Sequence, residues 1–275
     1  MKKAPRRIAS VTRRSSNSIA TLGYVVRSLA YVLLALALPA VAQPAAQGKP
    51  VYAVLSLIGD KVNVIVARNL PGQEFAASRG SMTPIEGVFD AVAVDAASRA
   101  IWSVAPKAEI AQLSVRGKAI YERQADWFAE SGGTIRIPPE VAEGAKQQAA
   151  THLVLLMKQR APVVWNLPGS AKPKTNALFK GPGEGLGFVV DLPAGKDGEI
   201  VSFANFQVLV VDLSTLTVVG RNPVVAASAV PADAGSADAA WRDFSAWQKT
   251  RALEFLIRDQ VMQAVRSLFE LIAPV

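Results

Sequence analysis

The chain contains no cysteine and only one histidine among its 275 residues. The absence of cysteine excludes disulfides, thiolate metal sites, cysteine nucleophiles and the acylated cysteine of bacterial lipoproteins. Metal sites built on two or three histidines are excluded as well, because His152 is the only imidazole. No glycine-rich segment carries the Gly-Lys-Ser/Thr of a phosphate-binding loop. We therefore expect no metal and no organic cofactor.

Acidic residues are absent from positions 1–42, which hold seven basic residues: Lys2, Lys3, Arg6, Arg7, Arg13, Arg14 and Arg27. The whole chain has 30 basic and 22 acidic residues, a formal net charge of +8. Subtracting the seven leaves 23 basic against 22 acidic residues, a net charge of +1 for the remainder. Nucleic-acid binding needs a cationic surface, so we expect no nucleic-acid partner for this near-neutral body.

The arrangement of residues 1–42 predicts a signal peptide. The cationic stretch is followed by the apolar run Leu29–Leu38, by Pro39, and by Ala40-Val41-Ala42 before Gln43. The run is shorter than the ~20 residues that cross a bilayer, so cleavage after Ala42 is favoured over an uncleaved anchor. Arg13-Arg14 fits an ordinary basic region better than a twin-arginine signal, although both export routes stay open. The prediction is a periplasmic protein with no stable transmembrane segment after cleavage.

Residues 43–50 form a short tether rich in alanine, glutamine and proline, and residues 51–275 are predicted to form a single α/β domain. Two strand-like runs around Gly59-Asp60 predict a β-hairpin. A capping box at Thr83–Glu86 predicts a helix to about Ile101, and a second one at Ser245–Gln248 predicts a helix to about Ile272. Further strands are predicted at 109–115, 186–192, 203–213 and 216–225, and further helices at 117–130 and from 138 onward.

The uniformly apolar run Leu153–Met157 predicts a central strand that is covered on both faces. Early strands separated by helices, then a strand-rich stretch, then a terminal helix indicate the fold class. We predict an α/β fold with α+β character: one mixed β-sheet with helices packed on it and a long C-terminal helix.

The C-terminal helix carries a second apolar stripe besides its core stripe. Phe255, Met262 and Phe269 are spaced by seven residues and form this second stripe. Packing within the chain explains such a stripe, and so does docking of another envelope protein or of a second copy. These three residues are therefore a candidate interface.

Ser56, Asp60 and His152 are the residues from which a serine-hydrolase triad could be built. Gly59-Asp60 superficially resembles the Gly-Asp-Ser motif of the SGNH hydrolases, but Lys61 stands where the nucleophilic serine should be. Parallel strands would also place His152 about 15–20 Å from the other two, at ~3.3 Å per residue. A turn aspartate and a strand-initiating histidine are the favoured interpretation, and no residue is assigned as catalytic.

A long segment, 166–185, is rich in glycine, proline and lysine. Lys172, Lys174, Phe179 and Lys180 make it a candidate contact loop for an anionic surface such as lipid headgroups or a cell-wall polymer. A solvated surface loop is the simpler interpretation.

Three stretches carry a resemblance: Tyr52–Asp60, Thr151–Leu156 and Glu184–Asp191. They resemble a family of secreted, functionally uncharacterised proteins of Gram-negative bacteria, and the likeness extends over most of residues 43–275. The resemblance implies an exported protein and brings no activity with it. The sequence thus predicts an exported, non-enzymatic binding or assembly module of the envelope, with a serine-type hydrolase as the alternative.

Overall fold

A computed structural model describes residues 49–68, 76–84, 87–115, 117–165, 174–175, 183–192, 199–230 and 237–272. Residues Lys49–Val275 form one compact unit of the chain. The predicted signal peptide and all but the last two residues of the predicted tether lie outside the described residues, so both stay predictions.

The strands are β1 (Val51–Leu57), β2 (Val62–Arg68), β3 (Ala76–Met82), β4 (Glu109–Gln112), β5 (Glu130–Ser131), β6 (Thr134–Ile135), β7 (His152–Lys158), β8 (Arg160–Ala161), β9 (Val164–Trp165), β10 (Lys174–Thr175), β11 (Gly183–Leu192), β12 (Glu199–Asp212) and β13 (Thr217–Val230). The helices are α2 (Val88–Val104), α3 (Lys118–Glu122), α4 (Gln124–Trp127), α5 (Pro139–Gln147), α6 (Ala237–Asp243) and α7 (Ala246–Ile272). The predicted helix over 117–130 is divided into the short helices α3 and α4 and ends before β5.

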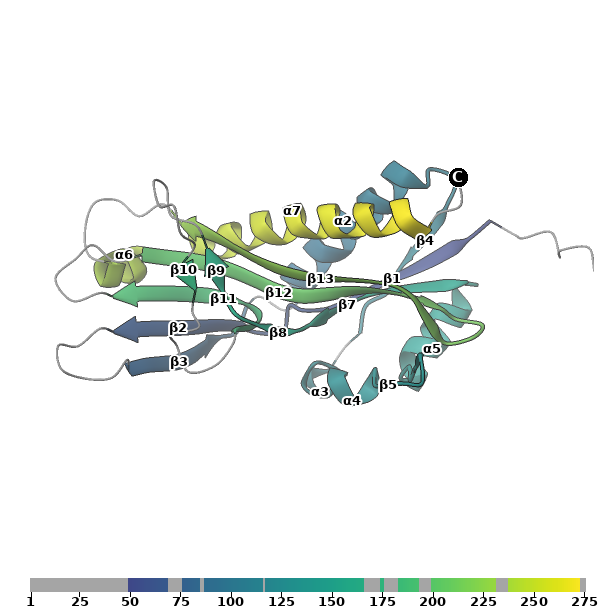
Figure 1. Ribbon diagram of the computed structural model, residues 1–275, viewed down its shortest axis with the longest axis horizontal. Helices are drawn as coiled ribbons and strands as arrows, with labels where there is room; N and C mark the ends of the chain where they lie inside the picture. Colours follow the sequence, from purple (N-terminus) through teal and green to yellow (C-terminus); the bar gives the residue numbers. More distant parts are fainter. Residues whose placement is uncertain are drawn as a thin grey trace, which may run out of the picture. The chain divides into compact units, whose positions relative to one another are not determined.

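Eleven of these strands form one mixed sheet, shown in Figure 1. Its main path runs β3-β2-β11-β12-β13-β6-β5, and a branch leads from β12 through β7 and β1 to β4. β1 is parallel to β4 and β7, whereas β12 is antiparallel to β7, β11 and β13. The predicted α/β fold, with one mixed sheet, packed helices and a long C-terminal helix, is confirmed.

The long strand β12 joins the two parts of the sheet. Its first half pairs with β11 up to Asn205 opposite Gly185, and its second half pairs with β7 from Phe206 opposite Lys158. β7 and β11 therefore follow one another along the same edge of β12 and run in the same direction. The backbone bridges the change of partner, because the N–H of Gln159 donates to the carbonyl of Asn205.

The predicted hairpin at Gly59-Asp60 is wrong. β1 is parallel to β7 and β2 is parallel to β11, and no pairing joins β1 to β2. The chain therefore continues in one direction through Ile58–Lys61 and passes from one part of the sheet to the other. β1 is buried along its length and gains neighbours on both sides, β4 and β7, which a hairpin with β2 would not provide. The change from one part of the sheet to the other involves two segments, Ile58–Lys61 and Lys158–Arg160. We call these two segments together the strand junction.

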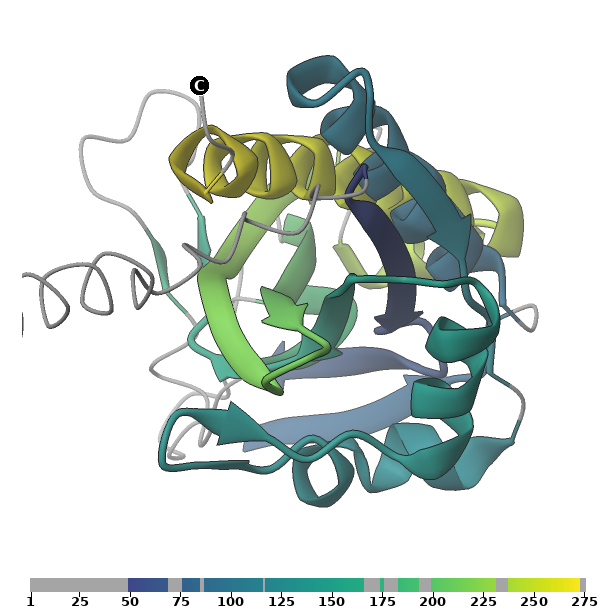
Figure 2. The same ribbon diagram turned by 90° about the vertical axis from the view of Figure 1, so that its right-hand side faces the viewer.

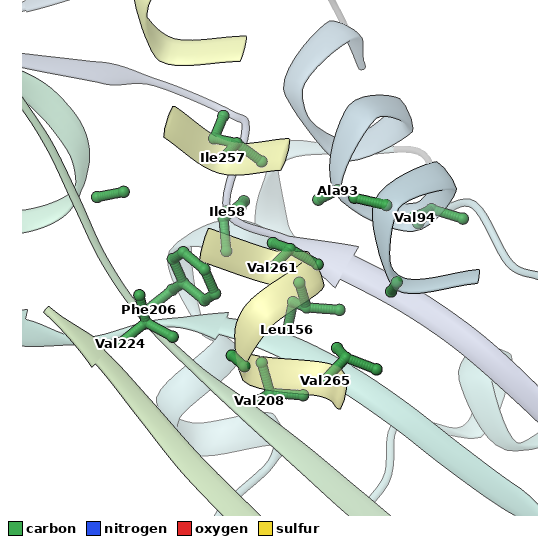
Figure 3. Packing of buried hydrophobic residues seen from close by; sticks show 14 of the residues in the cluster. Ile58, Ala93, Val94, Leu156, Phe206, Val208, Val224, Ile257, Val261 and Val265 are labelled. Atoms are coloured by element: carbon green, nitrogen blue, oxygen red, sulfur yellow. The ribbon is translucent and has the colours of Figure 1, made fainter. Parts of the chain in front are cut away.

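Helices cover both faces of the sheet (Figure 1). α2, α6 and α7 pack on one face and contribute to the largest cluster of buried side chains. Figure 3 shows Val261 and Val265 of α7 close to Leu156 of β7 in this cluster. α3, α4 and α5 lie on the other face, as the end-on view of Figure 2 also shows, around a second cluster.

The strand β7 divides its side chains between these two clusters. Val154 and Leu156 belong to the first cluster, and Leu153 and Leu155 belong to the second. The prediction of a central strand covered on both faces is confirmed, since alternate side chains of a strand point to opposite faces.

The start of α7 agrees with its predicted capping box, whereas the start of α2 differs from its own. At the predicted capping box before α7, the Ser245 N–H donates to Gln248 Oε1 at 2.8 Å and the Gln248 N–H donates to Ser245 Oγ at 3.2 Å. By contrast, α2 begins at Val88 and not at the Thr83–Glu86 box. Gly87 precedes it with φ 74°, a left-handed conformation that glycine adopts without strain.

Candidate functional site

The carboxylate of Asp90, in the first turn of α2, holds the β1 side of the strand junction. Its Oδ1 accepts hydrogen bonds from Ser56 Oγ at 2.7 Å and from the backbone N–H groups of Ile58 at 3.0 Å and Gly59 at 3.1 Å. Its Oδ2 accepts one from the Tyr121 hydroxyl at 3.0 Å. Burial raises the pKa of Asp90, and these four hydrogen bonds act in the opposite direction. Asp90 is therefore a buried hub that ties β1, α2 and α3 together.

The side chain of Gln124 bridges β1 and β7 where the two strands reach the junction. Its Nε2 donates to the carbonyl of Leu57 at 3.3 Å, and its Oε1 accepts from the backbone N–H of Lys158 at 2.8 Å. The ammonium of Lys158 pairs with Asp60 Oδ1 at 2.9 Å, and only 9% and 13% of the two side chains are exposed. Because an unpaired buried charge is costly, this ion pair constrains the junction geometry.

The three residues of the hydrolase alternative are not brought together. Ser56 donates to Asp90 and Asp60 pairs with Lys158, as described above. His152 lies in register with Tyr52, four residues before Ser56 on the parallel strand, which corresponds to about 13 Å along the strand. A serine nucleophile must lie within hydrogen-bond reach of its base, so this arrangement does not favour a serine hydrolase.

The surroundings of His152 are structural in character. Its ring centroid lies 5.2 Å from that of Tyr52, and its Nδ1 lies 2.9 Å from Thr151 Oγ1. Burial lowers the pKa of His152, and the negative charge of Asp212 partly opposes this shift. The imidazole is thus harder to protonate than a free one, and it packs against the start of β1.

The proposed stripe Phe255, Met262 and Phe269 on α7 is not one continuous exposed surface. Phe255 is 76% exposed, Met262 is partly buried against the main cluster, and Phe269 is 0% exposed. The ring of Phe269 meets the ring of Tyr52 edge-on at 4.9 Å between centroids. β1 therefore covers this stripe at the end of α7, and in this structure Phe269 belongs to the core and not to an interface.

Sequence reasoning missed a second exposed aromatic residue on α7. Trp247 is 70% exposed, and at 100° per residue it lies within 80° of Arg251 and Phe255 around the helix. The guanidinium of Arg251 lies 5.8 Å from the Trp247 ring centroid and also pairs with Glu254 at 3.2 Å. The spacing of four residues between Trp247, Arg251 and Phe255 is visible in the sequence, but the capping box at Ser245–Gln248 gives no sign that Trp247 is exposed. We call Trp247, Arg251 and Phe255 the α7 aromatic face.

The candidate contact loop falls almost wholly outside the described residues. Lys172, Phe179 and Lys180 are not described, and the backbone of Lys174 lies in β10, where it pairs with Trp165. Its role as a contact loop stays a prediction.

Within the described ranges the chain has neither a cluster of metal-ligating side chains nor a helix that could span a membrane. No group of three or more histidine, aspartate or glutamate side chains there could hold a metal ion. No helix in those ranges combines the length and the hydropathy needed to span a bilayer.

No known family model and no curated protein matches this chain. Among solved structures the chain is similar to a PelC dodecamer from Paraburkholderia phytofirmans, with 11% identity, 80% of this chain and 89% of that chain covered, and a TM-score of 0.30. It is also similar to XCC0632 from Xanthomonas campestris, of the family DUF330, with 10% identity, 80% and 86% covered and a TM-score of 0.32. A third is the hypothetical protein CT253 from Chlamydia trachomatis, with 16% identity, 80% and 99% covered and a TM-score of 0.28. Likenesses this weak support no conclusion about function.

Proposed function

We propose that this chain is an exported, non-enzymatic module of the bacterial envelope that docks a protein partner on the α7 aromatic face. The charge asymmetry, apolar run and small-residue cleavage site of residues 1–42 support export to the periplasm. The observation that carries the docking role is the exposure of Trp247 and Phe255 on one face of a helix whose opposite side packs in the core.

The size of this face is suited to a small interaction centre. Aromatic side chains bury roughly 150–250 Å² each, so covering the exposed parts of both rings removes about 300 Å² from water. At ~25 cal/mol per Å² this contributes about 7 kcal/mol before the entropy cost of association. Tryptophan and arginine are also the residues most enriched at the energetic centres of protein interfaces. Arg251 beside Trp247 fits that composition.

The partner is another envelope protein or a second copy of this chain, and one experiment distinguishes them. Cells express the full chain, and the protein is purified from the periplasmic extract for light scattering and for capture of bound proteins. We expect either a mass above that of the monomer or one specific captured protein. The double substitution Trp247→Ala and Phe255→Ala should weaken that association at least about tenfold. Trp102→Ala is the matched control, since Trp102 is a half-exposed aromatic residue on α2.

Two results would overturn the proposal. One is a wild-type protein that is monomeric and captures the same proteins as the Trp247→Ala, Phe255→Ala double variant. The other is a protein that stays in the cytosol with residues 1–42 attached.

A further inference from the structure

A pocket of about 390 Å³ opens beside the strand junction, on the face of the sheet opposite α7. Residues from β2, β3, β8 and β11 line it. In the β2–β3 ladder Asn63 pairs with Ser81 and Ile65 pairs with Arg79, so these four side chains share one face. Ile65 is nearly fully buried, and it lines the pocket together with the polar side chains of Asn63, Arg79 and Ser81.

The charged side chains of this pocket are mostly cationic. Among the described residues, Lys61, Arg79 and Arg160 line it together with the carboxylate of Glu184. The chain beyond residue 42 is near neutral, with a net charge of +1, and these side chains place positive charge on one concave surface. A concave surface strengthens such a local potential because solvent screens it less than a flat one.

Three interactions hold the pocket wall in place. Arg160 Nε lies 2.9 Å from Glu184 Oε2, and the backbones of these two residues also pair between β8 and β11. Asn63 Nδ2 donates to the backbone carbonyl of Glu184, which connects this wall to β2. Three strands thus bring the cationic groups Lys61 and Arg160 to one opening. Guanidinium groups present several donors in a fixed plane, a geometry that matches phosphate and carboxylate oxygens.

We propose that this pocket binds a small multivalent anion, a molecule that carries at least two phosphate or carboxylate groups. The site is separate from the α7 aromatic face and does not depend on the docking role. Glu184 limits its affinity, because this carboxylate occupies Arg160 and repels the ligand.

Isothermal titration calorimetry of the exported protein tests this, with inorganic pyrophosphate in one arm and citrate in the other, at constant ionic strength set with chloride. We expect saturable one-to-one binding of at least one probe, and the arm that binds identifies the group recognised. Lys61→Gln and Arg160→Gln should each weaken binding about fivefold to tenfold. Glu184→Gln should strengthen it severalfold, an effect that loss of a merely structural ion pair would not produce.

Arg99→Gln is the matched control. Arg99 is an exposed arginine that pairs with Asp95 at 3.1 Å on α2 and does not line the pocket. The Arg99→Gln substitution removes one positive charge, as the Arg160 substitution does, and should change the affinity for either probe less than about twofold. The absence of saturable binding to both probes overturns the proposal. Equal losses of affinity in Lys61→Gln and Arg99→Gln also overturn it. So does a Glu184→Gln variant that binds the probes more weakly than the wild type.

Discussion

Replacing Asp90 with alanine should destabilise the protein by about 3 to 5 kcal/mol. The substitution removes the acceptor of four hydrogen bonds, from Ser56, Ile58, Gly59 and Tyr121. Each buried donor left without an acceptor costs roughly 1–3 kcal/mol, and the total is less than the sum because water enters part of the space. A domain is stable by only about 5–15 kcal/mol, so the loss is large.

Asp90→Asn should be much milder, within about 1.5 kcal/mol at pH 7. The asparagine carbonyl can accept from Ser56, Ile58 and Gly59, and its amide can donate to the oxygen of Tyr121. This variant also isolates the titration of Asp90. Burial raises the pKa of Asp90 in the folded state, so the folded carboxyl binds a proton more tightly than the unfolded one. The stability that comes from this tighter proton binding is therefore full below the unfolded pKa of about 3.9 and is lost as pH rises through the folded value.

Urea denaturation followed by tryptophan fluorescence measures these differences. Asp95→Ala is the control, because Asp95 lies on the same helix in an exposed ion pair. Relative to Asp90→Asn, the wild type should gain stability as the pH falls from 7 toward 4. The reasoning is refuted if Asp90→Ala costs no more than Asp95→Ala, or if the wild type loses stability relative to Asp90→Asn over that range.

Two further predictions concern the C-terminal helix and the single histidine. Phe269→Ala should lower the unfolding free energy by about 3–5 kcal/mol, and Phe255→Ala by less than about 0.5 kcal/mol, because only the ring of Phe269 is in the core. Equal losses in denaturant titrations of the two variants would contradict the packing of α7. Because burial lowers the pKa of His152, its neutral form contributes stability that is present above pH ~6.5 and lost as pH falls through the folded value. His152→Gln should flatten the dependence of stability on pH between 7 and 5, and an unchanged slope would contradict it.

Features that depend on neighbours in sequence were predicted well. The capping box at Ser245 and Gln248 is a contact across three residues, and it forms as expected. The strand over Leu153–Met157 was predicted as doubly covered because its apolar run has no polar side to expose. The mixed sheet and the long terminal helix followed from the order of such local patterns.

The strand junction could not be predicted in this way. Gly59-Asp60 has the composition of a hairpin turn, yet the chain continues forward because β1 and β2 find different partners. Asp90, which receives the backbone N–H groups of this segment, lies more than thirty residues away in the sequence. Glu184, whose carbonyl accepts from Asn63, lies 121 residues away. Nothing in the local composition of either segment identifies such a partner.

The helix α7 shows the same division between pattern and packing. Heptad spacing correctly marks Phe255, Met262 and Phe269 as an apolar line, since that depends only on the helical repeat. Whether each ring lies in the core or in solvent depends on what packs against that turn: Tyr52 of β1 contacts Phe269, whereas Phe255 is 76% exposed. Composition and periodicity thus predict an export signal, the fold class and the apolar lines of several elements. The tertiary contacts alone decide which of those faces stays open to a partner, because burial is a property of the assembled chain.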